Sequence, residues 1–231
     1  MPILTPQDMQ AIWLSVKVSA TATLLATPFG FGTACLLTYG RLPGKTLLEG
    51  ILNLPLVLPP VVVGYLLLLS FGAKSPLGTL LARFGLRVIF TPAGAVLASA
   101  VVGFPLLVRA IRLGLESIDH RYLQAARTLG ATRLDTLLTI VIPLSGRALL
   151  AGMVLMFARS LGEFGATIVV AGNIPGVTQT VPLAIYDSIN TPAGDQHALT
   201  LCLISIAISL AVLLFSEAAA RKHRPAWRDA T

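Results

Sequence analysis

Charged residues are scarce in this sequence of 231 residues. They make up 12 % of the chain, whereas a soluble globular domain has about 25 %. Apolar residues make up 55 %, which is more than a single core in water could enclose. These two values exclude an ordinary soluble domain and indicate a protein whose solvent is the lipid bilayer.

Cysteine and histidine are also rare. Cys35 and Cys202 lie inside apolar runs, and His120, His197 and His223 are far apart, with no cluster of carboxylates beside them. We therefore predict no metal site and no cofactor. The chain also lacks the Gly-x-x-x-x-Gly-Lys-Ser/Thr phosphate loop and any Ser/His/Asp or Cys/His catalytic set, so we predict that it is not an enzyme and does not itself hydrolyse ATP.

Long apolar runs are what the sequence has instead. A helix that crosses the hydrocarbon core needs roughly 20 mainly apolar residues. We predict five such helices, at Ile12–Tyr39, Gly50–Gly72, Pro92–Arg109, Ala148–Gly172 and Ala198–Ala220. The expected fold class is all-α, a polytopic membrane helical bundle that forms a single domain over residues 1–231.

The positions of the basic residues give the bundle an orientation. With five spans, one side of the membrane holds two Lys or Arg residues in the loop 40–49, six in the loop 109–147 and four in the C-terminal tail. The other side holds three. Lys and Arg concentrate in cytoplasmic loops, so we predict an outside N-terminus and a cytoplasmic C-terminus. The same rule accounts for the net charge of +7 without a nucleic-acid partner.

The longest polar segment, QAARTLGATRLDTLLTIVIPL (124–144), falls in the predicted cytoplasmic loop. Asp119 is placed to cap a helix through HRYLQAARTL, and Gly130 is placed to end it in the left-handed conformation. Thr132 and Asp135 have the spacing of a capping box at the start of a second short helix. Pro143 is expected to stop that helix or bend it into the next span.

Two interpretations of this helix–Gly–helix loop remain open from the residues alone. Ala125 and Ala126 would give the first helix a shallow face, which the backbone of another protein could approach closely. Alternatively, the loop packs only under its own bundle. Neither short helix carries enough apolar surface to form a core by itself.

One pair of charges lies inside a predicted span. Arg159 is about twelve residues into the fourth span, which at 1.5 Å per residue is near the middle of the bilayer. A charge at that depth is costly, and Glu163, four residues on, can pair with it. Gly162 and Gly165 weaken the helix at the same level, as in the broken helices that line transport paths. We favour a pathway or gate over a purely structural pair.

Prolines interrupt the second predicted span at Pro55, Pro59 and Pro60. Each proline frees a carbonyl group that water or a neighbouring helix must satisfy inside a membrane. The same prolines are compatible with a translocation path and with a simple kink that packing holds in place. For Pro59 and Pro60 we favour the kink.

The loop resembles the EAA loop of ABC importer permeases. The positions that fit this pattern are Gln124, Ala125, Ala126, Gly130, Ile140, Ile142 and Pro143, and Gln124 stands where the family usually has glutamate. The resemblance implies that residues of about 117–144 form a coupling loop. Its first short helix would sit in a groove of a cytoplasmic ABC ATPase subunit.

Two further stretches, LNLPLVLPPVVVGYLLL (52–68) and FARSLGEFGATIVVAGNIPGVTQTVPLAIY (157–186), are similar to those of molybdate ABC transporter permeases and, more weakly, sulfate permeases. The resemblance implies the membrane subunit of an ATP-driven importer of molybdate, and of tungstate, in the bacterial plasma (inner) membrane. It also implies a homodimer, separate ATPase subunits and an extracytoplasmic molybdate-binding protein. A sulfate or thiosulfate importer is the alternative within this class. A proton-coupled carrier with Arg159 and Glu163 as a relay is less favoured, because such carriers commonly have repeated halves.

Overall fold

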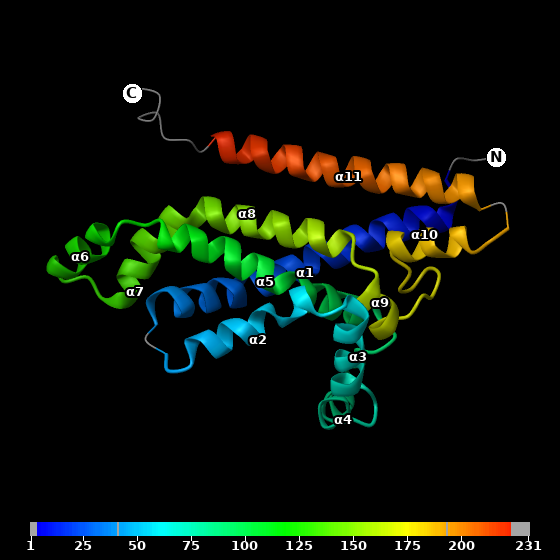
Figure 1. Cartoon of the computed structure of the whole chain (residues 1–231), viewed down its shortest axis with the longest axis horizontal. Helices are drawn as coiled ribbons and strands as arrows, with labels where there is room; N and C mark the ends of the chain where they lie inside the picture. Colours follow the sequence, from blue (N-terminus) through cyan, green and yellow to red (C-terminus); the bar gives the residue numbers. More distant parts are fainter. Residues whose placement is uncertain (1–3, 41, 193, 223–231) are drawn as a thin grey trace.

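Helices form the whole framework of the chain in the computed structural model, which describes residues 4–40, 42–192 and 194–222 (Figure 1). In chain order they are α1 (Pro6–Tyr39), α2 (Lys45–Val57), α3 (Pro60–Phe71), α4 (Pro76–Arg83), α5 (Pro92–Glu116), α6 (His120–Thr128), α7 (Arg133–Thr136), the π-helical segment η1 (Leu137–Val141), α8 (Ile142–Leu161), α9 (Gly165–Val170), α10 (Val181–Ile189) and α11 (Asp195–Lys222). The described residues contain no strand, and the predicted all-α membrane bundle is confirmed.

Four helical stretches are long and apolar enough to cross a membrane. They are Pro6–Tyr39, Pro92–Glu116, Arg133–Leu161 and Asp195–Phe215. The fifth predicted span, Gly50–Gly72, is a pair of helices, α2 and α3, with a bend of 113° between them. The predicted number of five is reached when this bent pair counts as one broken span.

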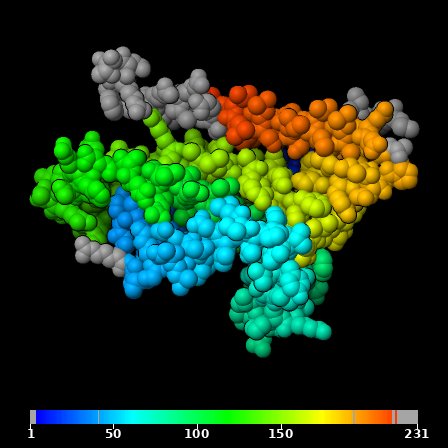
Figure 2. All heavy atoms as spheres, in the orientation of Figure 1, coloured from blue at the N-terminus to red at the C-terminus, as the bar shows by residue number. Residues whose placement is uncertain are grey.

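The bend between α2 and α3 is far sharper than the simple kink that we predicted at Pro59 and Pro60. Leu58 has an extended backbone (φ −70°, ψ 143°), the conformation that a residue before proline prefers. Neither proline has an N–H group to continue the helix, so a new helix starts with Pro60 in its first turn. Figure 2 shows α3 and α4 projecting from the body of the bundle.

The fourth span also differs from its prediction, Ala148–Gly172. The helical stretch begins already at Arg133, runs through η1 into α8 and ends at Leu161. Pro143 therefore neither ends the second loop helix nor separates it from the span. It lies in the first turn of α8, directly after the π-helical residues, whose wider turn accommodates a residue that has no N–H to donate.

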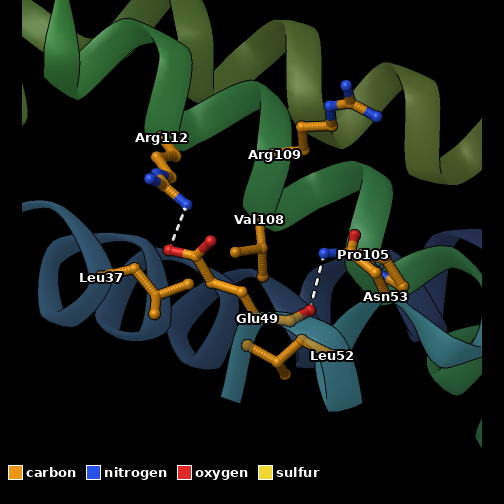
Figure 3. A pocket seen from close by; sticks show the side chains of 8 residues that line it. All are labelled: Leu37, Glu49, Leu52, Asn53, Pro105, Val108, Arg109 and Arg112. Atoms are coloured by element: carbon orange, nitrogen blue, oxygen red, sulfur yellow. Dashed lines mark hydrogen bonds and ion pairs between the residues drawn. The ribbon is translucent and has the colours of Figure 1, made fainter. Parts of the chain in front are cut away.

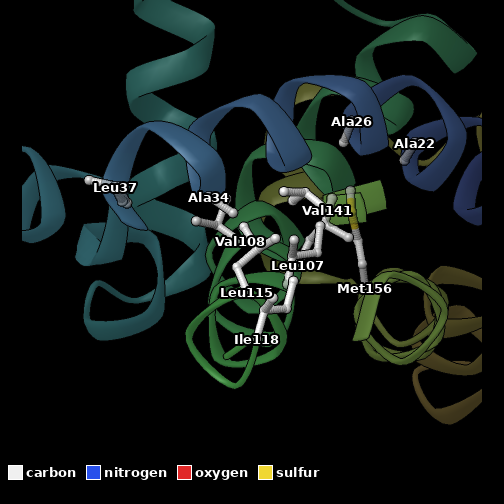
Figure 4. Close-up of a cluster of buried hydrophobic side chains, with 11 residues drawn as sticks. Ala22, Ala26, Ala34, Leu37, Leu107, Val108, Leu115, Ile118, Val141 and Met156 are labelled. Carbon is white, nitrogen blue, oxygen red and sulfur yellow. The ribbon is translucent and has the colours of Figure 1, made fainter. Parts of the chain in front are cut away.

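The main core lies where α1, α5 and α8 pack together (Figure 4). Leu107 of α5 is fully buried at its centre. A Cβ atom on Gly30 of α1 would lie 2.7 Å from the Leu107 side chain, and one on Gly152 of α8 would lie 3.1 Å from its carbonyl oxygen. The two glycines let the three helices approach closely. The buried apolar members of this cluster are Ala22, Ala26, Ala34, Leu37, Leu107, Val108, Ile111, Leu115, Ile118, Val141 and Met156.

The last helix, α11, packs against α10 and α8. Ala198 and Leu201, near its start, are buried, and Nε2 of His197 lies 3.0 Å from Oδ1 of Asp8 in α1. These contacts join the beginnings of the first and last helices. Four residues that entered the charge and metal predictions lie outside the described residues, namely Arg41, His223, Arg224 and Arg228. Within the described residues, no group of His, Cys, Asp and Glu could hold a metal ion.

Candidate functional site

The first helix of the candidate coupling loop, α6, has defined ends. The Asp119 carboxylate accepts a hydrogen bond of 2.9 Å from the backbone N–H of Arg121. At the other end Gly130 has φ +83°, and the N–H of Ala131 donates to the carbonyl of Ala126 at 3.0 Å. This pattern is the Schellman ending, which requires a left-handed residue and so favours glycine. The predicted cap and the predicted role of Gly130 in the backbone are both present.

The second helix of the loop, α7, starts with a capping box. The Thr132 hydroxyl accepts from the N–H of Asp135 at 3.2 Å, and the Asp135 carboxylate accepts from the N–H of Thr132 at 3.1 Å. These two residues therefore satisfy two of the backbone donors that the helix start leaves free. Beyond this box, Ile140 lies within η1, and the helix continues into α8.

The structure separates the two alanines that we had placed on one shallow face of α6. Gln124 and Ala125 are exposed, whereas Ala126 is 8 % exposed and packs toward its own chain. Successive residues of a helix point about 100° apart, so a partner approaching from outside would meet Ala125 and Gln124 but not Ala126. The shared-face interpretation of Ala125 and Ala126 is therefore wrong.

Large apolar side chains on this loop were not among the predicted site residues. Leu129 is 87 % exposed, Leu134 is 63 % exposed and Tyr122 is 58 % exposed. The sequence signal for these residues was the presence of large apolar side chains in an otherwise polar segment. Together with the exposed arginines Arg121, Arg127 and Arg133 they form a surface that is both apolar and basic.

The intramembrane pair consists of one buried and one reachable side chain. Nη1 of Arg159 lies 2.6 Å from Oε2 of Glu163, and the two side chains are 31 % and 1 % exposed. The other carboxylate oxygen of Glu163 accepts a hydrogen bond of 2.8 Å from the backbone N–H of Ala166. Glu163 thus connects α8 to the first turn of α9.

The helix is broken at this pair. α8 ends at Leu161, and α9 starts at Gly165. Gly162 is exposed, and no atom lies within 4 Å of where its Cβ would be. Gly165 is buried, and its Cβ would lie 2.9 Å from Cβ of Pro60, at the start of α3. The two glycines thus have different roles, because Gly162 faces open space and Gly165 permits the contact between α9 and α3.

A second polar group, absent from the predictions, holds the segment after α9. The Asp187 carboxylate in α10 accepts hydrogen bonds of 2.7 Å from the side-chain amides of Asn173 and Gln179. The N–H of Val181, the first residue of α10, donates to the Ser15 hydroxyl of α1 at 2.8 Å. These bonds fix the segment 173–180 against the bundle between the fourth and fifth spans.

A pocket of about 300 Å³ lies between α2 and α5 (Figure 3). Arg112 of α5 forms ion pairs with Glu49 of α2 at 2.8 Å and with Glu116 at 2.6 Å. No residue of α2 is buried. The start of α2 is therefore held to the bundle by this ion pair and by the partly buried Leu48 and Leu52, which pack against the main core.

Comparisons with known proteins agree with the geometry. The family described as "Binding-protein-dependent transport system inner membrane component" matches residues 26–225. The chain is 54 % identical over 223 residues to the molybdenum transport system permease protein ModB of Escherichia coli (strain K12), covering 96 % of this chain and 97 % of that protein. It is 37 % identical over 217 residues to the sulfate transport system permease protein CysT of Salmonella typhimurium (strain LT2), covering 93 % and 76 %.

A solved structure supports the same fold. A bacterial alginate ABC transporter, crystallised with an alginate pentasaccharide-bound periplasmic protein, superposes with a TM-score of 0.75 at 17 % identity, covering 94 % of this chain and 80 % of that one. The predicted importer permease is therefore confirmed. The chain belongs to the family of inner membrane components of binding-protein-dependent transport systems, and it is a multi-pass transport subunit rather than an enzyme.

Proposed function

We propose that the chain is the membrane subunit of an ATP-driven importer of molybdate that also accepts tungstate. The observation that carries this proposal is the 54 % identity, over nearly the full length of both chains, to a molybdenum transport permease. At this identity the broken helices and the loop of the two proteins are expected to correspond closely. The whole chain, 1–231, acts as one membrane domain.

The importer is assembled from several proteins. Two copies of this chain form the path between them, two cytoplasmic ATPase subunits supply the energy, and an extracytoplasmic binding protein delivers the anion. The N-terminus lies outside and the C-terminus in the cytoplasm, which is supported by the excess of Lys and Arg in the loop 109–147.

The loop of about 117–144 couples the permease to the ATPase. Its preformed caps present α6 as a rigid unit, and the exposed Tyr122, Leu129 and Leu134 supply apolar area for a partner to bury. Gln124, Ala125, Gly130, Ile140 and Pro143 shape this unit, and Ala126 anchors it to the bundle. Because the exposed charges of α6 are basic, the groove that receives it is expected to be acidic.

The pathway or gate passes Arg159, Glu163, Gly162 and Gly165. Arg159 is partly exposed in the last turn of α8, next to the break between α8 and α9. Transporters commonly place their paths at such discontinuous helices, since the freed backbone groups require a polar surrounding.

Substrate competition tests the proposal. Vesicles that contain the chain, its ATPase and its binding protein should take up labelled molybdate only with ATP. Tungstate should compete strongly, and sulfate at similar concentration should compete weakly. Molybdate, tungstate and sulfate are all tetrahedral dianions, so selection is expected by size and mainly in the binding protein.

Two results would assign a different function. Strong ATP-driven uptake of sulfate without a response to tungstate would place the chain with sulfate permeases. The 37 % identity to a sulfate permease is the reason to test this alternative. Uptake that a proton gradient drives without ATP would contradict the importer itself.

A further inference from the structure

Arg159 keeps part of its hydrogen-bonding capacity free. Of its nitrogens, Nη1 contacts Glu163 at 2.6 Å, and within the described residues no hydrogen bond is formed by Nε or Nη2. The side chain is 31 % exposed, while that of Glu163 is 1 % exposed. An anion could therefore reach the guanidinium group but could not reach the carboxylate.

The position of Arg159 on α8 supports this access. Ala151, Leu155 and Gly162, at spacings of three and four residues from it and from one another, are all exposed. The arginine thus belongs to a face of α8 that the described part of the bundle leaves uncovered. A charge on such a face of a membrane-spanning helix requires a polar or water-filled space.

The start of α3 adds positive potential next to the pair. Pro60 and Val61 lie against Gly165, where a Cβ atom would be 2.9 Å from Cβ of Pro60 and 3.2 Å from the Val61 nitrogen. The positive end of this helix of 12 residues therefore lies beside the same break. Both Arg159 and α3 favour an anion here, and Glu163 offsets them.

We propose that Arg159 is the residue that contacts the passing oxyanion, and that Glu163 is a built-in competitor which the oxyanion displaces. This inference rests on the proposed function. A carboxylate and a tetrahedral oxyanion present the same kind of oxygen acceptors to a guanidinium group. As the anion arrives, Arg159 redirects its N–H groups to it. Glu163 stays in place, because Ala166 holds its other oxygen at 2.8 Å.

Competition by Glu163 limits how tightly Arg159 binds the anion during transport. An unpaired arginine that is only partly exposed to water would hold a dianion strongly, and conduction requires binding weak enough for the ion to leave. Glu163 lowers the affinity of Arg159 for the anion and so shortens its stay. Removing the charge of Glu163 should therefore tighten anion binding and slow its release.

The test compares substitutions in the assembled permease–ATPase complex in nanodiscs, without ATP, with binding of labelled tungstate measured by equilibrium dialysis. Glu163→Gln keeps an oxygen that can accept from Ala166 and removes the competing charge. It should bind tungstate about tenfold more tightly than the wild type, and it should slow ATP-driven uptake. The double variant Arg159→Gln/Glu163→Gln should lose this gain. Arg147→Gln, at an exposed arginine of the same helix, should behave as the wild type.

A second measurement needs no variant. Phenylglyoxal modifies reachable arginines, and mass spectrometry locates the adduct. Tungstate should protect Arg159 of the wild-type complex several-fold and should leave Arg147 unprotected.

The outcomes separate this inference from the proposed function. Equal tungstate binding by Glu163→Gln and the double variant, or an Arg159 that tungstate leaves unprotected, would overturn the inference while wild-type vesicles still import molybdate. Wild-type vesicles that import neither molybdate nor tungstate would instead overturn the proposed function.

Discussion

The coupling loop and the break at Glu163 are held together in opposite ways. In the loop, the fixing hydrogen bonds join residues two to five positions apart, as between Thr132 and Asp135, and most side chains are exposed. At the break, Glu163 is 1 % exposed, and Gly165 packs against Pro60, which is more than a hundred positions away in the chain.

This difference has a consequence for how each region responds to force. The loop has its shape before a partner binds, so it can dock as a finished unit with little loss of conformational entropy. The break depends on the packing of α3 against α9, and α3 is connected to the bundle through a bend of 113°. A movement of α3 would therefore alter the surroundings of the ion pair but not the loop.

The largest effect is expected where a buried charge loses its partner. Arg159→Ala leaves the Glu163 carboxylate unpaired, at a cost of about 3–5 kcal/mol, so yield and ATP-driven uptake should both fall sharply. Adding Glu163→Ala should restore assembly, measured by size-exclusion chromatography, but not uptake. Full recovery of regulated uptake in the double variant would show that the pair is only structural.

The contact between α3 and α9 can be broken without touching a charge. A Cβ on Gly64 would lie 2.9 Å from Cα and from the carbonyl oxygen of Ala166, so Gly64→Ala should destabilise the protein by about 1–3 kcal/mol. Gly50→Ala, in α2 with nothing within 4 Å of the added atom, is the matched control and should leave stability unchanged or raise it slightly. Thermal unfolding of the solubilised complex measures both, and equal midpoints would contradict the importance of this packing.

The loop should respond to backbone strain rather than to crowding. Gly130 has φ +83° with open space around it, so Gly130→Leu should cost about 1–2 kcal/mol through its left-handed conformation alone. The protein should still insert into the membrane, while copurification of the ATPase falls by a factor of about 5–30. Gly146→Leu, also in open space but helical, should copurify normally. Unchanged copurification and uptake in Gly130→Leu would exclude the coupling role.

The substitution with the smallest expected effect tests on which side of the membrane the loop lies. In a chain with Cys35 and Cys202 replaced by alanine, Thr128→Cys removes only an exposed hydrogen bond to the Ala125 carbonyl, so activity should be nearly normal. An impermeant maleimide applied to intact cells should not label it. Lys74→Cys, exposed in the segment between α3 and α4, should be labelled. The reverse pattern would invert the predicted topology.

Features that depend on neighbouring residues could be predicted from the sequence. The capping box at Thr132, the left-handed Gly130 and the pairing of Arg159 with Glu163 all involve residues at most four positions apart or a single backbone angle. Their physical causes are contained within one turn of helix. The resemblance of the loop to importer permeases has the same local basis, and the family is confirmed.

Features that depend on tertiary packing were missed. The 113° bend at Pro59, the separate helix α10 and the inward direction of Ala126 each depend on contacts with distant segments. A proline pair predicts that the helix is interrupted, but it does not predict the angle between α2 and α3. That angle is set by the packing of α3 against α9, at Gly64 and Gly165. The Asp187 group was missed for the same reason, since Asn173 and Gln179 meet Asp187 only in the folded bundle.

The unbroken helical stretch from Arg133 to Leu161 connects the coupling loop mechanically to the break at Arg159 and Glu163. At 1.5 Å per residue, Arg133 and Arg159 are about 39 Å apart along the axis. A force on the loop would thus displace the whole helical stretch together with the guanidinium group of Arg159. The π-helical segment η1 would be the part that deforms most easily. Gly162 directly follows the end of this stretch, and Glu163 lies beyond it. A displacement of the stretch would therefore move Arg159 away from Glu163 instead of bending the membrane-spanning helix.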